Sequence, residues 1–179
     1  MFLKNSPAGY GLFSKSLHWL NALLVIILIG LGFYMVGLTY YDRWYNAALT
    51  WHKSLGLIAL GLAMGMAGWQ WYSPPPATLP GLQRWERLGA RIMHIALMGM
   101  MLVIPFSGYL ISTSAGQGVE IFGLARIPAL LHGGTTLRDV AIAVHFYAAY
   151  GTALLVIGHG GAALKHHFVN RDDTLRRML

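Results

Sequence analysis

Long apolar stretches separated by short polar segments dominate the chain. Four of these stretches are long enough to cross a membrane as helices, because a span needs about 20 apolar residues. Aromatic, polar and proline residues mark their ends, as is typical of membrane spans. The pattern therefore predicts four transmembrane helices, over residues 17–38, 49–72, 92–111 and 140–164.

Several residues bear on the shape and the ends of these predicted helices. The prolines at 74–76 should end the second helix, because proline lacks the N–H donor. Pro105 should kink the third helix unless other groups satisfy the freed carbonyl. Asp139 is expected to cap the fourth helix. Small residues in the second helix let helix backbones or a flat ring come close, and we expect most of them to serve helix packing. They are Gly56, Gly61, Gly65 and Gly68.

The composition supports this interpretation. Hydrophobic residues make up 56% and charged residues 11% of the 179 residues, whereas soluble domains have about 25% charged residues. The first apolar stretch is too long for a signal-peptide core, so we expect it to be retained. We predict one all-α domain over residues 1–179, an integral membrane four-helix bundle in contact with the lipid bilayer. The absence of cysteine excludes disulfides, thiolate metal sites and the covalent C-x-x-C-H haem attachment.

The basic residues flank the apolar stretches instead of following one polar face. The formal net charge is +7, but membrane topology explains this placement, which argues against nucleic-acid binding. Nine Lys and Arg residues lie on the side of the N-terminus and four on the other side. Because cytoplasmic loops carry the excess of positive charge, we expect both termini in the cytoplasm. The connection over residues 113–138 is then external, and it lies on the outer membrane surface or folds over the bundle mouth.

Five histidines lie within or at the edges of the predicted helices, where an ionisable side chain is costly and suggests a function. His145 and His159 are 14 residues apart on one helix. At about 100° and about 1.5 Å per residue, they face the same side and are separated by roughly 21 Å. This spacing favours two metal centres at two depths of the membrane. The five are His18, His52, His94, His145 and His159.

Each centre needs an opposing ligand at the same depth. His52 begins the second helix on the outer side and matches His145. On the inner side His18 begins the first helix and matches His159. His94 begins the third helix on the same side and could compete with His18, and the spacing does not decide between them. Two histidines on a haem iron leave no open position, which favours electron transfer over oxygen chemistry at the metal.

Short segments around these histidines resemble the bacterial cytochrome b561 family. The resemblance covers nearly the whole chain and extends more loosely to the cytochrome b subunits of membrane-bound hydrogenases and formate dehydrogenases. The spacing of the histidines is its most specific part. It is carried by Ser16-Leu17-His18-Trp19, by His52-Lys53-Ser54-Leu55-Gly56, by the pair His145 and His159, and by His166-His167-Phe168 before Asp173-Thr174-Leu175.

The resemblance implies two non-covalent haem b groups, each held by two histidines. His18 and His159 would hold the inner haem, and His52 and His145 the outer haem. This favours His18 over His94, which then becomes a structural residue near the inner haem. It also implies a multi-pass protein of the bacterial inner membrane.

The best-defined members of the family look like superoxide oxidases. These oxidoreductases take an electron from superoxide at the outer surface and reduce ubiquinone through the two haems. The resemblance suggests a quinone beside the inner haem, with Ser16 and His166 as the matching residues. His166 would deliver a proton to the reduced quinone. Two simpler interpretations stay open: Ser16 could cap the first helix, and His166 could be a solvated residue next to the membrane.

A positive outer surface would concentrate the superoxide anion near the outer haem. Lys53 is the strongest candidate because it adjoins His52. The other candidates are Arg43, Arg126 and Arg138, and all four cations could instead pair with haem propionates or lipid phosphates.

Two other functions remain open. The chain could be an anchor subunit that relays electrons from a partner dehydrogenase or hydrogenase, and its external connection looks more like that wider family. It could also be a histidine-lined zinc or proton transporter, although no Asp or Glu falls within a span core. A coloured preparation excludes the transporter, and reduction by superoxide without a partner separates the enzyme from the relay subunit.

Overall fold

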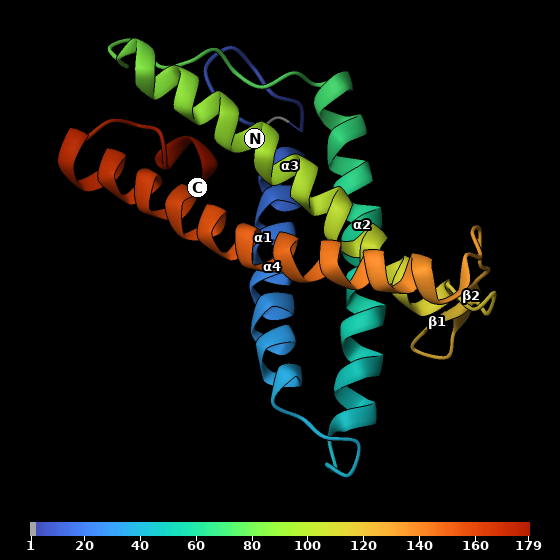
Figure 1. Cartoon of the computed structure of the whole chain (residues 1–179). Coiled ribbons are helices and arrows are strands. Elements are labelled where there is room, and N and C mark those ends of the chain that lie inside the picture. Colours follow the sequence, from blue (N-terminus) through green and yellow to red (C-terminus); the bar gives the residue numbers. More distant parts are fainter. Residues whose placement is uncertain (1–2) are drawn as a thin grey trace.

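The computed structural model describes residues 3–179, and four long helices dominate this part of the chain (Figure 1). All four are long and apolar enough to cross a membrane. A two-stranded hairpin lies between the third and fourth helices, and a π-helical turn and a 3-10 turn follow the fourth. In chain order the elements are α1 (Leu12–Val36), α2 (Tyr45–Tyr72), α3 (Arg84–Thr113), β1 (Val119–Ile121), β2 (Ala125–Ile127), α4 (Gly134–Lys165), η1 (His166–Asn170) and η2 (Arg176–Met178).

The helices form two antiparallel pairs that are inclined to each other, α1 with α2 and α3 with α4 (Figure 1). The interface between α3 and α4 is the most extensive, and α3 also packs against α2. In contrast, α1 and α4 share little backbone contact. The side chains that α1 and α2 direct toward α4 therefore meet it across a space that helix packing does not close.

α1, α2 and α4 begin earlier than the apolar pattern suggested, because helical hydrogen bonding continues into the polar flanks. α3 starts at Arg84, where Gln83 and Glu86 form a reciprocal capping box. α4 starts at Gly134, so Asp139 lies inside the helix and does not cap it, contrary to the prediction. α2 ends at Tyr72, directly before Ser73 and the prolines, and α3 continues as helix through Pro105.

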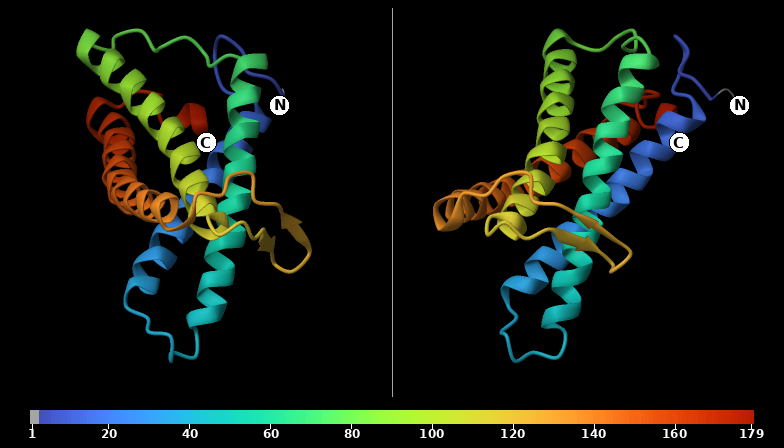
Figure 2. Two further views of the ribbon diagram at one scale, coloured as in Figure 1. Left: turned by 45° about the vertical axis from the view of Figure 1, so that its right-hand side comes forward. Right: turned by 90° about the vertical axis from the view of Figure 1, so that its right-hand side faces the viewer.

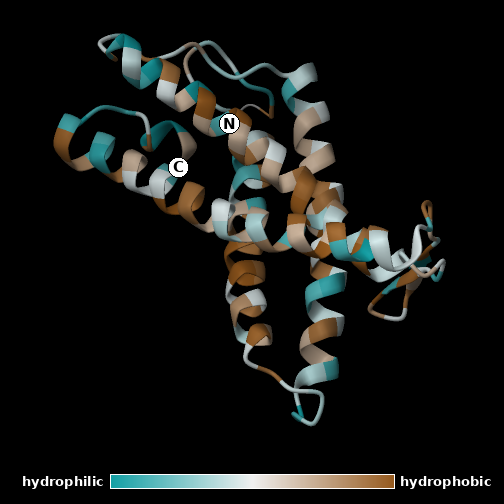
Figure 3. Cartoon of the chain, in the orientation of Figure 1, coloured by the Kyte–Doolittle hydropathy of each residue, from teal (hydrophilic) through white to brown (hydrophobic). Residues whose placement is uncertain are grey.

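Hydrophobic residues are spread along all four long helices (Figure 3). The packing is that of a membrane protein, with small residues inside and large apolar residues outside. Ala59, Ala63, Ser54 and Thr152 are among the buried residues, whereas many Leu, Ile and Phe side chains are exposed. The four glycines of α2 do not serve close helix packing as expected. A Cβ atom added at any of Gly56, Gly61, Gly65 or Gly68 would meet no atom within 4 Å.

The connection between α3 and α4 packs against the helices through its hairpin. Main-chain N–H of Phe122, at the turn between β1 and β2, donates to Oγ of the buried Ser54 at 2.9 Å. The Phe122 ring packs edge-on against Trp51, with 5.1 Å between the ring centroids. The turn needs positive φ at Phe122 and Gly123, a conformation that glycine adopts freely. These contacts fix the connection to α2.

The N-terminal segment, the α2–α3 connection and the C-terminal segment meet at one end of the bundle, which we call the terminal end (Figure 2). Asn5 N–H donates to Ser73 Oγ at 3.0 Å. The Trp19 indole N–H donates to the Met178 carbonyl at 2.8 Å. The far end of the α3–α4 pair, which carries β1 and β2, is called the hairpin end (Figure 1). Hydrogen bonds thus fix the described N-terminal segment to the α2–α3 connection and the C-terminal segment to α1.

Candidate metal centres

Two histidines face each other toward the hairpin end. His52 comes from the second turn of α2 and His145 from α4, and their ring centroids are 6.0 Å apart. Two metal–nitrogen bonds of roughly 2.0 Å each would fit between rings at this separation. Both side chains are half-buried. This pair is the one that the sequence predicts on the outer side.

Main-chain and side-chain groups of α3 hold the His145 ring. Its Nδ1 lies 2.9 Å from the Ile104 carbonyl oxygen and 3.1 Å from Ser107 Oγ. Ser107 Oγ itself donates to the Ile104 carbonyl at 2.7 Å. Because a carbonyl only accepts, Nδ1 carries the proton and Nε2 is left as the free electron-pair donor. Such a partner orients an imidazole toward a metal.

Two glycines leave room for the paired rings. A Cβ atom on Gly108 would lie 3.1 Å from His145 Cε1, and one on Gly32 would lie 3.4 Å from His52 Cε1. Nδ1 of His52 is buried and has no hydrogen-bond partner in residues 3–179. The two rings of the pair therefore differ, because only His145 is oriented by hydrogen bonds.

A cavity of about 410 Å³ lies beside this pair and is lined by both histidines. Its walls come from all four helices and are almost entirely apolar, and Gly56 of α2 and Lys53 are among its lining residues. An apolar slot with two imidazoles in its wall fits a flat, hydrophobic, metal-containing ring. Gly56 thus lines space for such a ring, which is the alternative that the sequence left open for the α2 glycines.

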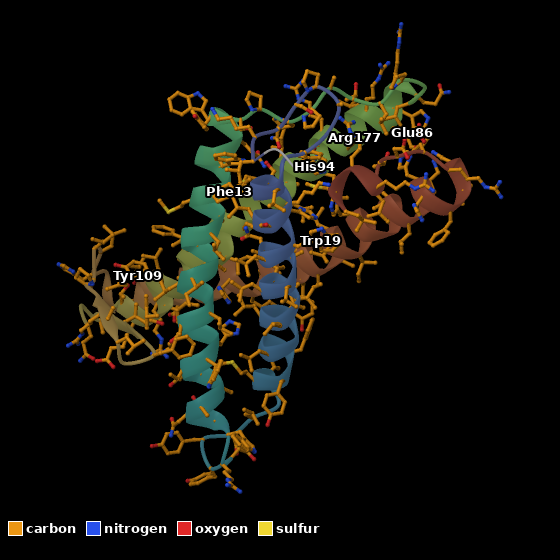
Figure 4. The ribbon with its side chains drawn as sticks, turned by 180° about the vertical axis from the view of Figure 1, so that it is seen from behind. Phe13, Trp19, Glu86, His94, Tyr109 and Arg177 are labelled. Atoms are coloured by element: carbon orange, nitrogen blue, oxygen red, sulfur yellow. The ribbon has the colours of Figure 1, made fainter. Side chains whose placement is uncertain are left out.

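Three histidines gather toward the terminal end. The centroid of the His159 ring on α4 is 6.1 Å from that of His18 on α1 and 5.4 Å from that of His94 on α3. His94 lies at the same end of the bundle as Trp19, the neighbour of His18 (Figure 4). Within residues 3–179 no group of three His, Cys, Asp or Glu side chains could hold one metal ion. His159 therefore has two alternative partners here, His18 and His94. Sequence spacing could not show that His94 is the nearer of the two.

His145 and His159 lie on one face of α4, and Thr152 is midway between them in the sequence. Thr152 is 2% exposed, lines the cavity, and its hydroxyl has no hydrogen-bond partner among the described residues. The uninterrupted helix keeps the two histidines roughly 21 Å apart along its axis.

The four cations expected on the outer side occupy different surroundings. Lys53 is half-buried and lines the cavity together with its neighbour His52. Arg43 packs over the Trp44 ring, 5.5 Å from its centroid. Arg126 extends along β2 toward Gly118, and Arg138 is exposed. Only Lys53 among these four lines the cavity with the histidine pair.

The residues expected at a quinone lie toward the terminal end. Ser16 is exposed on α1, two residues before His18, and it does not cap the helix, because α1 begins at Leu12 after Gly11. His166 begins the π-helical turn after α4, and its Nδ1 lies 2.7 Å from Asp172 Oδ2. The same Nδ1 lies 3.0 Å from Asn170 Nδ2. Because a carboxylate only accepts, the shorter bond to Asp172 requires the proton on Nδ1, and Nε2 is then the nitrogen that can exchange one with a ligand. No hydrogen bond joins Ser16 to His166 among residues 3–179.

Sequence reasoning did not single out Gly32, Ser107 or Ile104 for the site. The clearance at Gly32 and the hydrogen bonds to His145 depend on how three helices are rotated against one another. Gly108 was not singled out either, because a single sequence carries no signal that it approaches His145.

The chain matches known proteins over nearly its whole length. The profile of the family described as prokaryotic cytochrome b561 matches residues 9–179. Cytochrome b561 homolog 2 of Escherichia coli (strain K12) is 44% identical over 100% of this chain and 95% of its own length. Cytochrome b561 homolog 1 of the same organism is 25% identical, covering 93% of this chain and 96% of its own. Probable superoxide oxidase CybB of Yersinia pestis is 28% identical, covering 95% of each chain.

Proposed function

The chain belongs to the prokaryotic cytochrome b561 family, a family of bacterial multi-pass membrane cytochromes, and from this premise we propose that it transfers electrons through two haem b groups from a donor outside the cell membrane to a quinone. His52 and His145 would ligate one haem, and His18 and His159 the other. The observation that carries this proposal is the placement of two facing histidine pairs toward opposite ends of α4, 6.0 Å and 6.1 Å between ring centroids.

The residues around the His52–His145 pair fit a haem. The cavity is apolar, it is lined by both rings, and Gly108 and Gly32 leave the space that the rings occupy. Hydrogen bonds on Nδ1 direct Nε2 of His145 away from α3. When bound, haem b supplies a one-electron carrier whose iron is closed to other ligands by two imidazoles. The protein orients the imidazoles, excludes water from the ring and fixes the distance between the two centres.

We place the protein in the bacterial inner membrane, with the hairpin end outside and the terminal end in the cytoplasm. The excess of Lys and Arg at the terminal end supports this orientation. Lys53, in the wall of the cavity beside His52, would then attract a small anion from outside toward that histidine pair.

Superoxide is the donor that we propose, and ubiquinone the acceptor. Each of two superoxide anions would lose one electron and leave as dioxygen, while one quinone takes up two electrons and two protons. His166 would supply a proton through Nε2 while Asp172 holds its Nδ1, and Ser16 would bind a quinone carbonyl. The name of the 28% identical Yersinia pestis relative supports superoxide.

A second candidate function is that of an electron-relay subunit for a partner dehydrogenase. The observation in its favour is the hairpin, whose tip residue Leu124 is 88% exposed, with Leu130 nearby in sequence 70% exposed. These apolar side chains offer a surface for a partner protein. The relative with 44% identity is named only as a cytochrome b561 homolog, which fits either function.

The experiment that separates the two functions uses the purified chain alone in detergent with a ubiquinone analogue. Superoxide from an enzymatic source is added, and haem reduction and quinol formation are followed by absorbance. Haem reduction with quinol formation supports the oxidase. Haems that accept electrons from dithionite but not from superoxide would move the function to the relay subunit.

A further inference from the structure

The C-terminal residues fold back across the terminal end of the bundle instead of leaving it. The Met178 carbonyl accepts the indole N–H of Trp19 at 2.8 Å, and Nη1 of Arg177 donates to the Ala77 carbonyl at 2.9 Å. One short segment thus contacts both α1 and the α2–α3 connection, and Arg177 and Trp19 lie at the same end of the molecule (Figure 4). These bonds bring the guanidinium of Arg177 to a defined position.

The guanidinium has an unused edge. Nη1 is engaged by Ala77, but Nε is buried and has no hydrogen-bond partner among residues 3–179. No carboxylate of those residues forms an ion pair with Arg177, although its neighbour Arg176 pairs with Asp173 at 3.3 Å. A buried N–H of a charged group without an acceptor is costly. The edge formed by Nε and Nη2 is the one with which arginine binds a carboxylate by two parallel hydrogen bonds.

Arg177 is linked through Met178 to Trp19, the chain neighbour of His18. Arg177 is bonded to Met178, Met178 is hydrogen-bonded to Trp19, and Trp19 is the chain neighbour of His18, with 5.4 Å between their ring centroids. The positive charge of Arg177 also acts on Tyr10, which lies just before α1. Burial raises the pKa of the Tyr10 hydroxyl, and the positive charge of Arg177 partly offsets that rise.

Other polar atoms of the same region also lack partners. Nδ1 of His167 and Oγ1 of Thr174 are buried without a hydrogen-bond partner in the described part of the chain. Several unsatisfied polar atoms in one short segment are unusual, because buried polar groups nearly always find partners. They indicate that the C-terminal segment faces a polar group that does not belong to the chain.

We propose that Arg177 binds a haem propionate at the His18–His159 centre, so that the C-terminal segment is part of that cofactor site. This inference rests on the proposed function, because it needs a haem at that pair. The ligand chemistry is that of an oxyanion, and an anionic lipid phosphate is the other source of it. We favour the propionate because Nε of Arg177 is buried and the segment that carries it is hydrogen-bonded to Trp19, the chain neighbour of His18.

The test compares Arg177→Gln with the matched control Arg176→Gln, both in the full chain purified in detergent. Arg176 is the adjacent arginine, and its side chain is 67% exposed. Loss of a charge-assisted, two-bond contact should make one haem of Arg177→Gln dissociate about tenfold faster. Removal of the positive charge should also make the midpoint potential of the same haem more negative. Arg176→Gln should match wild type, and Arg177→Lys, which keeps the charge but not the two-bond edge, should lie between.

Reconstitution of the apoprotein with haem b dimethyl ester, which has no propionate charge, identifies the source of the oxyanion. With this haem the difference between wild type and Arg177→Gln should disappear. If the difference persists, or if Arg177→Gln loses bound anionic lipid while both potentials stay unchanged, the oxyanion is a lipid phosphate and the inference is wrong. Two normal haems in Arg177→Gln would also overturn it while leaving the proposed function intact. A wild-type chain without haem would contradict the proposed function itself.

Discussion

The Nδ1 atom of His145 on α4 lies 2.9 Å from the main-chain carbonyl oxygen of Ile104 on the neighbouring helix α3. This contact fixes the tautomer of the imidazole and leaves Nε2 as the free electron-pair donor. The ring centroid of His145 lies 6.0 Å from that of His52, whose own Nδ1 has no partner in residues 3–179. One ligand of the proposed centre is therefore oriented by α3, and the other is oriented by packing alone.

Replacement of Ser107 by alanine should weaken the hold on His145 without removing it, because the Ile104 carbonyl remains. We expect a loss of about 1 kcal/mol in the free energy of unfolding, the net value of one hydrogen bond. The imidazole becomes less basic when its N–H loses a partner, so the midpoint potential of the His52–His145 haem should rise. Redox titration measures this shift. The control is Ser114→Ala, which removes a buried hydroxyl that donates to the Ile111 carbonyl, and an equal shift there would contradict the role of Ser107.

Gly108→Ala should displace the His145 ring. The new Cβ atom would lie 3.1 Å from Cε1 of His145, a distance at which the ring has to move. We expect the variant to lose the haem of this pair and keep the other, which the haem-to-chain ratio of the purified protein measures. Gly99→Ala on the same helix is the control, because a Cβ atom there meets nothing within 4 Å. A Gly108→Ala protein with both haems in unchanged spectra would show that the ring has more room than the structure indicates.

Substitutions of His18 and of His94 should have opposite effects on the haem of the second centre. If His18 is the ligand, His18→Leu should lose one haem, whereas His94→Leu should keep both with low-spin spectra. His94 lies closer to His159, at 5.4 Å against 6.1 Å between ring centroids, so the comparison is a strict one. Electron paramagnetic resonance of the oxidised variants reports the ligands of each iron. Loss of the haem in His94→Leu alone would assign His94 as the ligand.

Lys53→Gln should slow reduction by superoxide while leaving the haem content unchanged. One charge several ångströms from the point of encounter changes the rate by about twofold in water at low salt. Because salt screens this attraction, the difference from wild type should shrink as ionic strength rises. Lys4→Gln, at the terminal end, is the control. Equal rates for wild type and Lys53→Gln at low salt would remove Lys53 from the proposed function.

The contact between Asp172 and His166 should persist to low pH. Burial raises the pKa of the Asp172 carboxyl, but hydrogen bonds from Thr174 and His166 outweigh this and hold the pKa below its ordinary value of 3.8. The stabilisation is therefore present above pH 3.8 and is lost as pH falls through the lower pKa of the folded protein. Protease sensitivity of the C-terminal segment should stay constant from neutral pH to about pH 4 and rise below it. In Asp172→Asn the sensitivity should be higher at neutral pH, and in Asp173→Asn it should be normal.

Much of the fold could be predicted from the sequence. Apolar length gives the number of helices, and the 14-residue spacing of His145 and His159 gives their common face, because both depend on local geometry alone. The pairing of His52 with His145 could also be predicted, because the two residues are expected at the same depth of the membrane. The choice between His18 and His94 does not, because it depends on how α1 and α3 are rotated about α4.

Other features needed the three-dimensional arrangement. Asp139 is a residue type that often caps helices, but it lies inside α4. The helix begins at Gly134, among residues whose hydropathy predicts a loop. The glycines of α2 have the spacing of a packing motif but meet no neighbour, whereas Gly32 and Gly108 lie against histidine rings. Arg177 is one of many basic residues at the terminal end, and only its hydrogen bonds distinguish it from Arg176.

The first measurement to make is the ratio of haem b to polypeptide in the chain purified in detergent, together with its low-temperature electron paramagnetic resonance spectrum. Two haems per chain, both low-spin with bis-imidazole ligation, are expected from the two histidine pairs. Each should disappear separately, one in His52→Leu and the other in His18→Leu. A single haem that survives both substitutions, or a colourless chain that cannot be reconstituted with haem, would contradict the assignment of two centres.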